Sequence, residues 1–271
     1  MKKLLLLCFI VSPLFGAEQS FPIPQYEVAE SREFPHEKFK KFAALCSSDD
    51  SALFLKFLNK NKNNLNAPHY KAFDRCLGGD LSLPLHWAIE HSPNIDNIKH
   101  LLKCGVNPDL LVSKPVYNLS GEETILSKLA CKNSFTSLDR VELVRTLAPY
   151  SSVDSGLFTP SFHASPLALT AFHASLIERE IKKKKKEQLE IAAILICTGA
   201  SKQRALWEIQ QISRPFLLTL FRHQATEFLN NPELDTAIKK ERMLPFWKKV
   251  KQSGYKNIAH YLNARKQGLI K

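Results

Sequence analysis

A run of lysines is the first feature of this sequence with the chemistry of a functional site. Lys182, Lys183, Lys184, Lys185 and Lys186 are consecutive within the stretch EREIKKKKKEQLE. Adjacent cations of this kind can bind the phosphates of nucleic acid or of anionic lipid. Four acids bracket the run, and it contains no aromatic residue for stacking on bases. The pattern therefore favours a solvated extension of a helix, with anionic-surface binding as the alternative.

The cysteines do not have the spacing of a metal site. Five of them follow residue 17, separated by 30, 28, 27 and 66 positions: Cys46, Cys76, Cys104, Cys131 and Cys197. Zinc motifs place their ligands in close pairs, which are missing here. Cys104 and Cys197 lie in apolar runs, where a free thiol packs as a small hydrophobe. We predict packing roles and no bound metal, with a disulfide between elements as the alternative in an oxidising compartment.

Motifs of the common catalytic sites are missing from the sequence. It contains no glycine-rich phosphate loop, no His-Glu-x-x-His and no Gly-x-Ser-x-Gly. His86 has the chemistry of a base or a ligand, and Trp87 that of an anchor for a partner. Both lie in a short apolar pattern, which favours roles in the fold. We predict no enzymatic activity and no cofactor.

The N-terminal residues have the layout of an export signal. Two lysines precede an apolar run at 4–11, and small residues end the segment at Ala17. The run is shorter than the roughly 20 residues that a membrane-spanning helix needs. We predict a signal peptide at 1–17 and a periplasmic or secreted mature chain. Lipid attachment at Cys8 and an uncleaved anchor are the alternatives.

Composition and periodicity predict a globular, helical body. Hydrophobic residues make up 44% and charged residues 24% of the 271 positions, which excludes a disordered chain. The net charge is +12, or +10 without the two lysines of 1–17, and permits anionic partners without identifying one. Residues 18–35 carry prolines and predict an extended lead-in. From His36 onward, apolar residues recur at helical spacing.

A pair of short helices is encoded in LPLHWAIEHSPNIDNIKHLLKCGVNPD, residues 83–109. Pro84 suits the first position of a helix, because its missing N–H would have no partner there. Ser92-Pro93-Asn94 breaks the pattern, and an apolar stripe follows until Gly105, which can adopt the left-handed conformation that ends a helix. Each helix is too short to persist alone in water. The pair therefore needs neighbours.

Similar units recur along the chain. Leu85, Leu126 and Leu167 stand 41 residues apart, and Leu195–Ala200 matches Leu101–Val106 position for position. The lysine run is expected between the two helices of the unit that contains Leu167. We predict five to six helix pairs with long connecting loops within 36–268, near 36–65, 83–112, 122–155, 163–202, 206–231 and 243–266.

These units resemble ankyrin repeats. The family pattern is Thr-Pro-Leu-His, two small residues, a turn, and Val-x-x-Leu-Leu-x-x-Gly-Ala, with a period of 33. Residues 83–109 fit it well, 124–154 and 165–201 fit in part, and 244–266 fits in its first helix and turn. The longer spacing and the Ser-Pro-Asn turn depart from the pattern. The resemblance implies an all-α, ankyrin-like α-solenoid, and the long loops put regular β-turn fingers between repeats in doubt.

The resemblance also implies a function, that of a monomeric scaffold that binds another protein through its repeat face. The family's contact positions correspond here to Ser82, Glu90, His91, Glu123, Lys132, Asn133, Lys251 and Gln252. Solvated surface positions are the alternative for each of them. Exported proteins of this type resemble bacterial factors that act on a host. The alternative function is electrostatic binding to an anionic membrane or nucleic acid through Lys182–Lys186.

Overall fold

The computed structural model describes residues 33–252, apart from 49, 71–80, 93, 111–121, 132–137, 155–156, 160–161, 177–181 and 212–216. The predicted signal peptide and most of the lead-in lie outside these residues, as does the second half of the last predicted unit. The helices in the described part are α1 His36–Cys46, α2 Ser51–Lys60, α3 Pro84–His91, α4 Ile95–Lys103, α5 Ile125–Cys131, α6 Arg140–Leu147, α7 Pro166–Leu176, α8 Lys182–Thr198, α9 Lys202–Gln211, α10 Leu217–Leu229, α11 Pro232–Arg242 and α12 Pro245–Gln252. Two short 3₁₀ turns join them, η1 Lys62–Asn64 and η3 Ala148–Tyr150.

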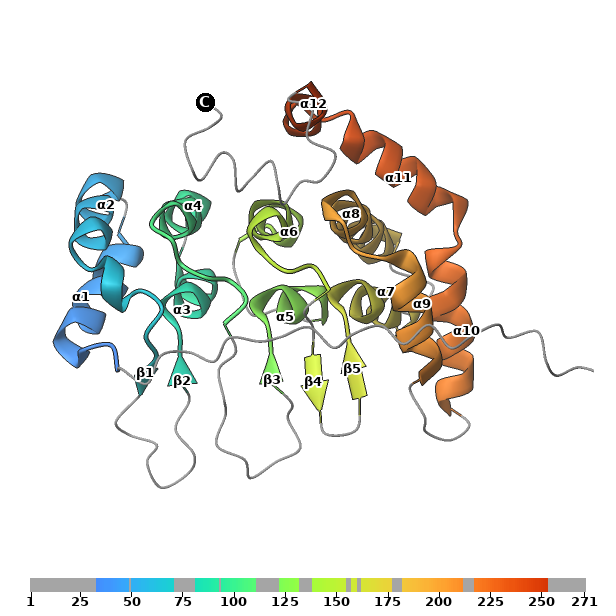
Figure 1. Cartoon of the computed structure of the whole chain (residues 1–271), viewed down its shortest axis with the longest axis horizontal. Helices are drawn as coiled ribbons and strands as arrows, with labels where there is room; N and C mark the ends of the chain where they lie inside the picture. Colours follow the sequence, from blue (N-terminus) through green and yellow to red (C-terminus); the bar gives the residue numbers. More distant parts are fainter. Residues whose placement is uncertain are drawn as a thin grey trace, which may run out of the picture.

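The first eight helices form four pairs that stand side by side in a row (Figure 1). Helices α1, α3, α5 and α7 make one layer, and α2, α4, α6 and α8 make the other. Neighbouring members of a layer pack together, for example α5 on α7 and α6 on α8. The prediction of a mainly helical chain is confirmed. One hydrophobic core runs through the row and includes residues of every pair.

The 41-residue spacing found in the sequence is the distance along the chain between the starts of the first helices in three successive pairs. Helices α3, α5 and α7 begin at Pro84, Ile125 and Pro166, each 41 residues after the last. In each, the residue before the helix accepts a hydrogen bond from the backbone N–H four residues on, at 2.9 to 3.0 Å. The leucines at this spacing are at most 1% exposed: Leu85, Leu126 and Leu167.

Glycines end the second helices of two pairs with the same backbone geometry. Gly105 has φ of 89° and Gly199 has φ of 119°, both in the left-handed region. Val106 donates its N–H to the carbonyl of Leu101 at 3.2 Å, and Ala200 repeats this bond to Leu195 at 2.9 Å. These bonds satisfy carbonyls that the helix leaves without partners. The prediction that Gly105 ends its helix is confirmed.

The Ser92-Pro93-Asn94 turn has a contact that links two pairs. The carbonyl of Cys46, at the end of α1, accepts hydrogen bonds from Ser92 Oγ at 3.2 Å and from Asn97 Nδ2 at 3.0 Å. Ser92 and Asn97 are both buried. Asn94 caps α4 by accepting from the backbone N–H of Asp96 at 2.8 Å. Polar side chains therefore hold this turn against the end of α1.

The loops after successive pairs are hydrogen-bonded to one another. Asn66 Oδ1 accepts from the N–H of Asn107 at 2.9 Å, across 41 residues of sequence. Asp109 Oδ2 accepts from the N–H of Ser152 at 2.7 Å. Asp154 Oδ1 accepts from the N–H of Ser201 at 3.5 Å. Because each bond joins one loop to the next, this ladder fixes the spacing of the four pairs.

Short strands lie along one side of the row (Figure 1). They are β1 His69–Tyr70, β2 Leu81–Ser82, β3 Glu122–Glu123, β4 Leu157–Thr159 and β5 Phe162–Ala164. β1 pairs with β2, and β4 pairs with both β3 and β5, all antiparallel. β2, β3 and β5 each lead directly into the first helix of a pair. The sequence predicted no strands, because two or three residues are too few to show an alternating pattern.

A buried carboxylate joins α9 to the last pair of the row. Glu208 is 0% exposed and accepts from the N–H of Ser165 at 2.8 Å. It also binds Arg204 Nε at 2.9 Å and His163 Nδ1 at 3.0 Å. Burial raises the pKa of Glu208, but the hydrogen bonds from His163, Ser165 and Arg204 outweigh burial and hold that pKa below its usual range. The carboxylate is therefore ionised at neutral pH.

Replacing Glu208 with glutamine should destabilise the protein in a pH-dependent way. We expect Glu208→Gln to lower the free energy of unfolding by about 3 kcal/mol at neutral pH, because the buried ion pair of Glu208 with Arg204 is broken. The folded-state pKa lies below the unfolded value, so the carboxylate's contribution is complete above about pH 4.3 and is lost as pH falls through the folded pKa. Urea denaturation of both proteins should therefore show a difference that narrows in acid. A difference that does not change with pH would contradict this account.

The turn at Ser92 gives a second stability test. Asn97→Ala should lower the free energy of unfolding by about 1 to 2 kcal/mol, because the buried carbonyl of Cys46 loses a donor. Lys103→Ala, at an exposed position of the same helix, should change it by less than about 0.5 kcal/mol. Thermal denaturation of the two variants compares them directly, and equal effects would count against the Asn97 contact.

Candidate functional site

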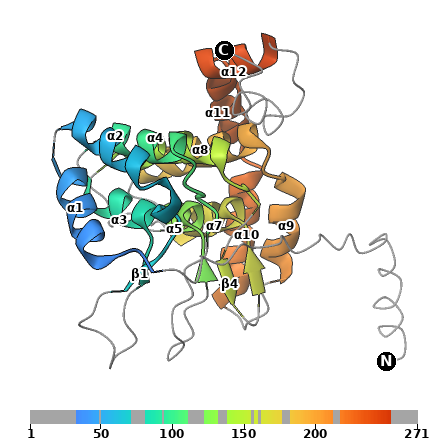
Figure 2. The ribbon, with the colours of Figure 1, turned by 60° about the vertical axis from the view of Figure 1, so that its left-hand side comes forward.

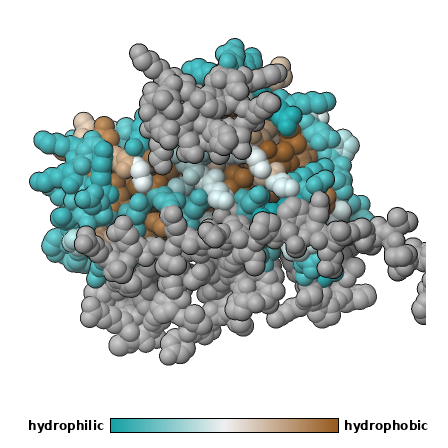
Figure 3. Space-filling view, viewed as in Figure 1, coloured by the Kyte–Doolittle hydropathy of each residue, from teal (hydrophilic) through white to brown (hydrophobic). Residues whose placement is uncertain are grey.

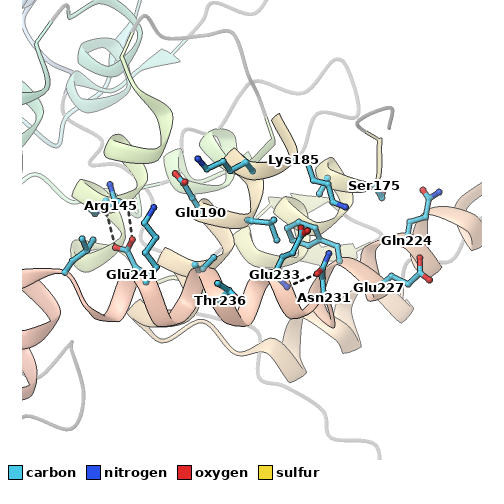
Figure 4. A pocket seen from close by; sticks show the side chains of 18 residues that line it. Arg145, Ser175, Lys185, Glu190, Gln224, Glu227, Asn231, Glu233, Thr236 and Glu241 are labelled. Carbon is cyan, nitrogen blue, oxygen red and sulfur yellow. Dashed lines mark hydrogen bonds and ion pairs between the residues drawn. The ribbon is translucent and has the colours of Figure 1, made fainter. Parts of the chain in front are cut away.

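A groove lies where the row of pairs meets the C-terminal helices. Helix α11 packs along α8, and α10 packs on α7. Between them is a cavity of about 1100 Å³ that opens to the surface (Figure 4). It is bounded by residues of α6, α7, α8, α10 and α11 and by Leu244. This volume is slightly larger than that of typical small-molecule sites, which is about 300 to 1,000 Å³.

The floor of the groove is apolar and its rim is charged. Its small and apolar lining residues are Ala174, Leu189, Ala193, Phe228, Ala237 and Leu244. Lys185 and Lys186 line it from α8, while Glu227 from α10 and Glu233 from α11 line it from the opposite side. Farther along, Glu190 lies on α8 and Lys240 on α11. The rim therefore offers both signs of charge to a bound molecule.

An ion pair closes one end of the groove and attaches α11 to the row. Arg145 of α6 binds Glu241 of α11 through Nε and Nη2, each 3.0 Å from a carboxylate oxygen. The indole N–H of Trp247 donates to Glu241 Oε1 at 3.2 Å. Glu241 is only 6% exposed, and its hydrogen bonds to Arg145 raise the pKa of that guanidinium. Paired, two-pronged contacts of this kind are geometrically specific.

The sequence reasoning missed α11, which forms one wall of the groove. The signals were present: Asn231 caps the helix by accepting from the N–H of Glu233 at 2.8 Å, and Pro232 holds the first helical position. Acids in the first turn and bases in the last add to that pattern. The segment lies between two predicted repeat units, where the repeat pattern predicts a loop. Helix α9 likewise begins at Lys202, four residues before the predicted unit at 206.

Two predicted contact residues lie on α3 and already have contacts within the protein. Glu90 is half-buried and forms an ion pair with Lys128 of α5 in the next pair. The ring of His91 lies 4.3 Å from the ring of Trp87. Trp87 packs against the hydrophobic core, with its ring 6.1 Å from that of Phe39. The expectation that Trp87 belongs to the core is therefore supported.

The remaining predicted contact residues are not gathered at one place. Ser82 is in β2 and Glu123 in β3, beside the first helices, whereas Lys251 and Gln252 are at the end of α12. Lys132 and Asn133 lie outside the described residues. Figure 1 places the strands and α12 on opposite sides of the row. The described part of the structure therefore does not bring these positions together in one site.

The lysine run has a different position from the predicted one. It forms the N-terminal part of α8, which begins at Lys182, and does not lie between the two helices of its pair. Lys184, Lys185 and Lys186 are exposed. Helix α8 has 17 residues, against 8 to 10 in α2, α4 and α6, so the run extends beyond the length of its neighbours. Lys185 and Lys186 belong to the rim of the groove.

The described cysteines are thiols in apolar surroundings. Burial raises the pKa of Cys46 to about 11, only partly opposed by Ser92. Burial also raises the pKa of Cys104 and of Cys197. A raised pKa keeps a thiol protonated and unreactive at neutral pH. In the described part of the chain, His, Cys, Asp and Glu form no group of three that could hold a metal ion.

The surface in Figure 3 is mostly hydrophilic, with apolar side chains showing between the polar ones. Three large apolar residues are exposed in the described part, Leu53 at 52%, Tyr150 at 44% and Met243 at 68%. None of the helices described is both long enough and apolar enough to cross a bilayer.

Comparison with protein families, curated proteins and solved structures gives no significant match for this chain.

The ion pair at the end of the groove should control the docking of α11. Arg145→Met leaves the buried carboxylate of Glu241 without its cation, which should cost about 1 to 3 kcal/mol given that Arg145 is partly exposed. Because the loss is local, amide hydrogen exchange should accelerate in α11 and α12 and stay unchanged in α2 and α4.

Lys99→Met is the matched control. Lys99 is a half-buried cation on α4, far from α11, that pairs with Asp96 at 2.9 Å and with Glu142 of α6 at 3.9 Å. Surface pairs contribute little, so the exchange pattern of α11 should not change. Uniform acceleration in all helices of the Arg145 variant would show that the ion pair has no specific role in docking.

Proposed function

We propose that this protein is an ankyrin-type α-solenoid, exported through a signal peptide at 1–17, that binds a partner protein and has no catalytic activity. Three features support the fold assignment: the row of helix pairs, first helices that start at 41-residue intervals, and loops bonded in succession. Stacks of this kind present extended surfaces for recognition. The ankyrin pattern of residues 83–109 agrees with them.

The groove between α8 and α11 is the proposed contact site, and it is the observation that carries the proposal. A polypeptide segment with apolar side chains suits its floor, while acidic and basic side chains suit the two sides of its rim. The groove follows α11, which runs from Pro232 to Arg242, and ten helical steps of 1.5 Å correspond to about 15 Å. This length accommodates about four residues of extended chain.

The repeat face is the second proposed contact region. Ser82, Glu90, His91 and Glu123 lie on or beside the first helices in successive pairs. Glu90 forms an ion pair with Lys128. A partner that binds Glu90 would therefore have to break this ion pair and replace it with a contact to the partner. Binding to the apolar floor of the groove breaks no ion pair. For this reason we place the main contact in the groove.

A tryptophan introduced into the groove should abolish partner capture. Thr236 is exposed and points into the groove (Figure 4), so Thr236→Trp fills the space without disturbing the core. The immobilised chain, without residues 1–17, is incubated with bacterial and eukaryotic cell extracts, and captured proteins are quantified by mass spectrometry. We expect at least a tenfold loss, corresponding to about 1.4 kcal/mol, for any specific partner.

Two controls locate the contact. Asp235→Trp places the same side chain at a neighbouring exposed position that does not line the groove, and it should leave capture unchanged. Glu90→Lys combined with His91→Glu tests the repeat face. Loss of capture in this second variant alone would move the contact to the repeat face, and capture unaffected by every variant would refute a specific binding function at either place.

A further inference from the structure

The positive charge of this protein is concentrated at its C-terminal end. Residues 239–271 contain ten Lys and Arg and one Glu, a net charge of +9 out of +12 for the chain. The preceding 238 residues therefore carry +3, of which the first 17 contribute +2. The one acid of the C-terminal stretch, Glu241, is buried and paired with Arg145. No other Asp or Glu lies within 239–271, and the nearest exposed carboxylates along the chain are Glu233 and Asp235 in the first turn of α11.

Five of these cations lie around the junction of α11 and α12, and all five are exposed. We call them the basic corner: Lys239, Lys240, Arg242, Lys248 and Lys249. Lys239 and Arg242 are three residues apart and so lie on one face of α11. Between the two helices, Met243 is 68% exposed, the most exposed large apolar side chain described. The corner thus combines dense positive charge with one projecting apolar group.

We propose that the basic corner docks the protein on an anionic lipid surface. Clusters of four to eight Lys or Arg near an apolar anchor bind acidic headgroups, each cation contributing about a fivefold increase in affinity. Figures 1 and 2 show α12 at the end of α11, projecting beyond the layer of α2, α4, α6 and α8. The junction of the two helices therefore lies at an edge of the described part of the molecule, where a flat surface can reach it. Met243 is placed to enter the headgroup region when the cations bind.

The same features disfavour nucleic acid as the target. Binding of single strands uses exposed aromatic rings on which bases stack. Phe246 and Trp247, the aromatic residues of α12, are half-buried, and the indole N–H of Trp247 is bound to Glu241. Of the five cations of the corner, only Lys240 lines the groove between α8 and α11, so the corner is a projecting end and not a channel that could follow a phosphate backbone. The proposal does not require a partner protein in that groove.

The test measures how much of the chain 18–271 sediments with lipid vesicles. One set of vesicles contains phosphatidylcholine alone, and the other contains about one third phosphatidylserine in phosphatidylcholine. We expect binding only to the anionic vesicles, and a steep loss of binding as salt rises. The variant Lys239→Gln/Lys248→Gln/Lys249→Gln removes three cations that do not line the groove. It should bind the anionic vesicles about a hundredfold more weakly.

The matched control is Lys184→Gln/Lys185→Gln/Lys186→Gln, which removes the same charge from the start of α8. It should keep full affinity for the vesicles. A loss as large as that of the corner variant would show that net charge, and not the corner, drives binding, and would overturn the proposal. Equal binding to neutral vesicles would overturn it as well.

Met243→Ser tests the apolar contribution and separates lipid from nucleic acid. We expect it to weaken vesicle binding about fivefold, because less apolar surface is buried in the headgroup region. A duplex DNA is titrated in parallel with each variant. If the corner variant loses DNA binding while the unmodified chain does not bind the vesicles, the corner is a nucleic-acid site and the lipid proposal is refuted.

Discussion

The need of short helices for neighbours determines this structure. Helices α2 to α6 have 7 to 10 residues, below the roughly 12 to 15 at which an isolated helix becomes stable in water. Each pair has an apolar stripe that it cannot bury against itself, so it must pack against the next pair. Packing alone leaves neighbouring pairs free to slide. The hydrogen bonds from Asn66, Asp109 and Asp154 to backbone N–H groups of the following loop remove that freedom, because each bond has one geometry.

The C-terminal helices are attached by a different means. The row depends on apolar contacts and loop hydrogen bonds, whereas α9 and α11 are each fixed by a buried glutamate. Glu208 joins α9 to the start of α7, and Glu241 joins α11 to α6. Buried carboxylates are tolerated only when their hydrogen-bonding capacity is used, so each glutamate accepts bonds from several donors at once. Such contacts add geometric definition where the repeat pattern no longer sets the position of the next helix, and they create the groove as a consequence.

The chain also separates its charges by region. The row of pairs, residues 36–198, has 21 Lys and Arg and 17 Asp and Glu spread along it, which suits a surface that recognises a partner by shape and local complementarity. The segment 239–271 has ten Lys and Arg and one Glu, which suits attraction that acts at longer range and depends on salt.

The sequence by itself determined the helical class, the 41-residue interval, the proline that opens α3 and the glycine that ends α4. These depend on local backbone preferences and on apolar periodicity, which act within a few residues. Only the tertiary structure decided the groove, the environment of Glu208 and Glu241, and the engagement of Glu90 with Lys128. Each of these joins residues 38 to 96 positions apart, so no local pattern encodes it. Helix α11 lies between these cases: its cap and proline are local signals, but its role as a wall depends on packing along α8, which arises only when the whole row is formed.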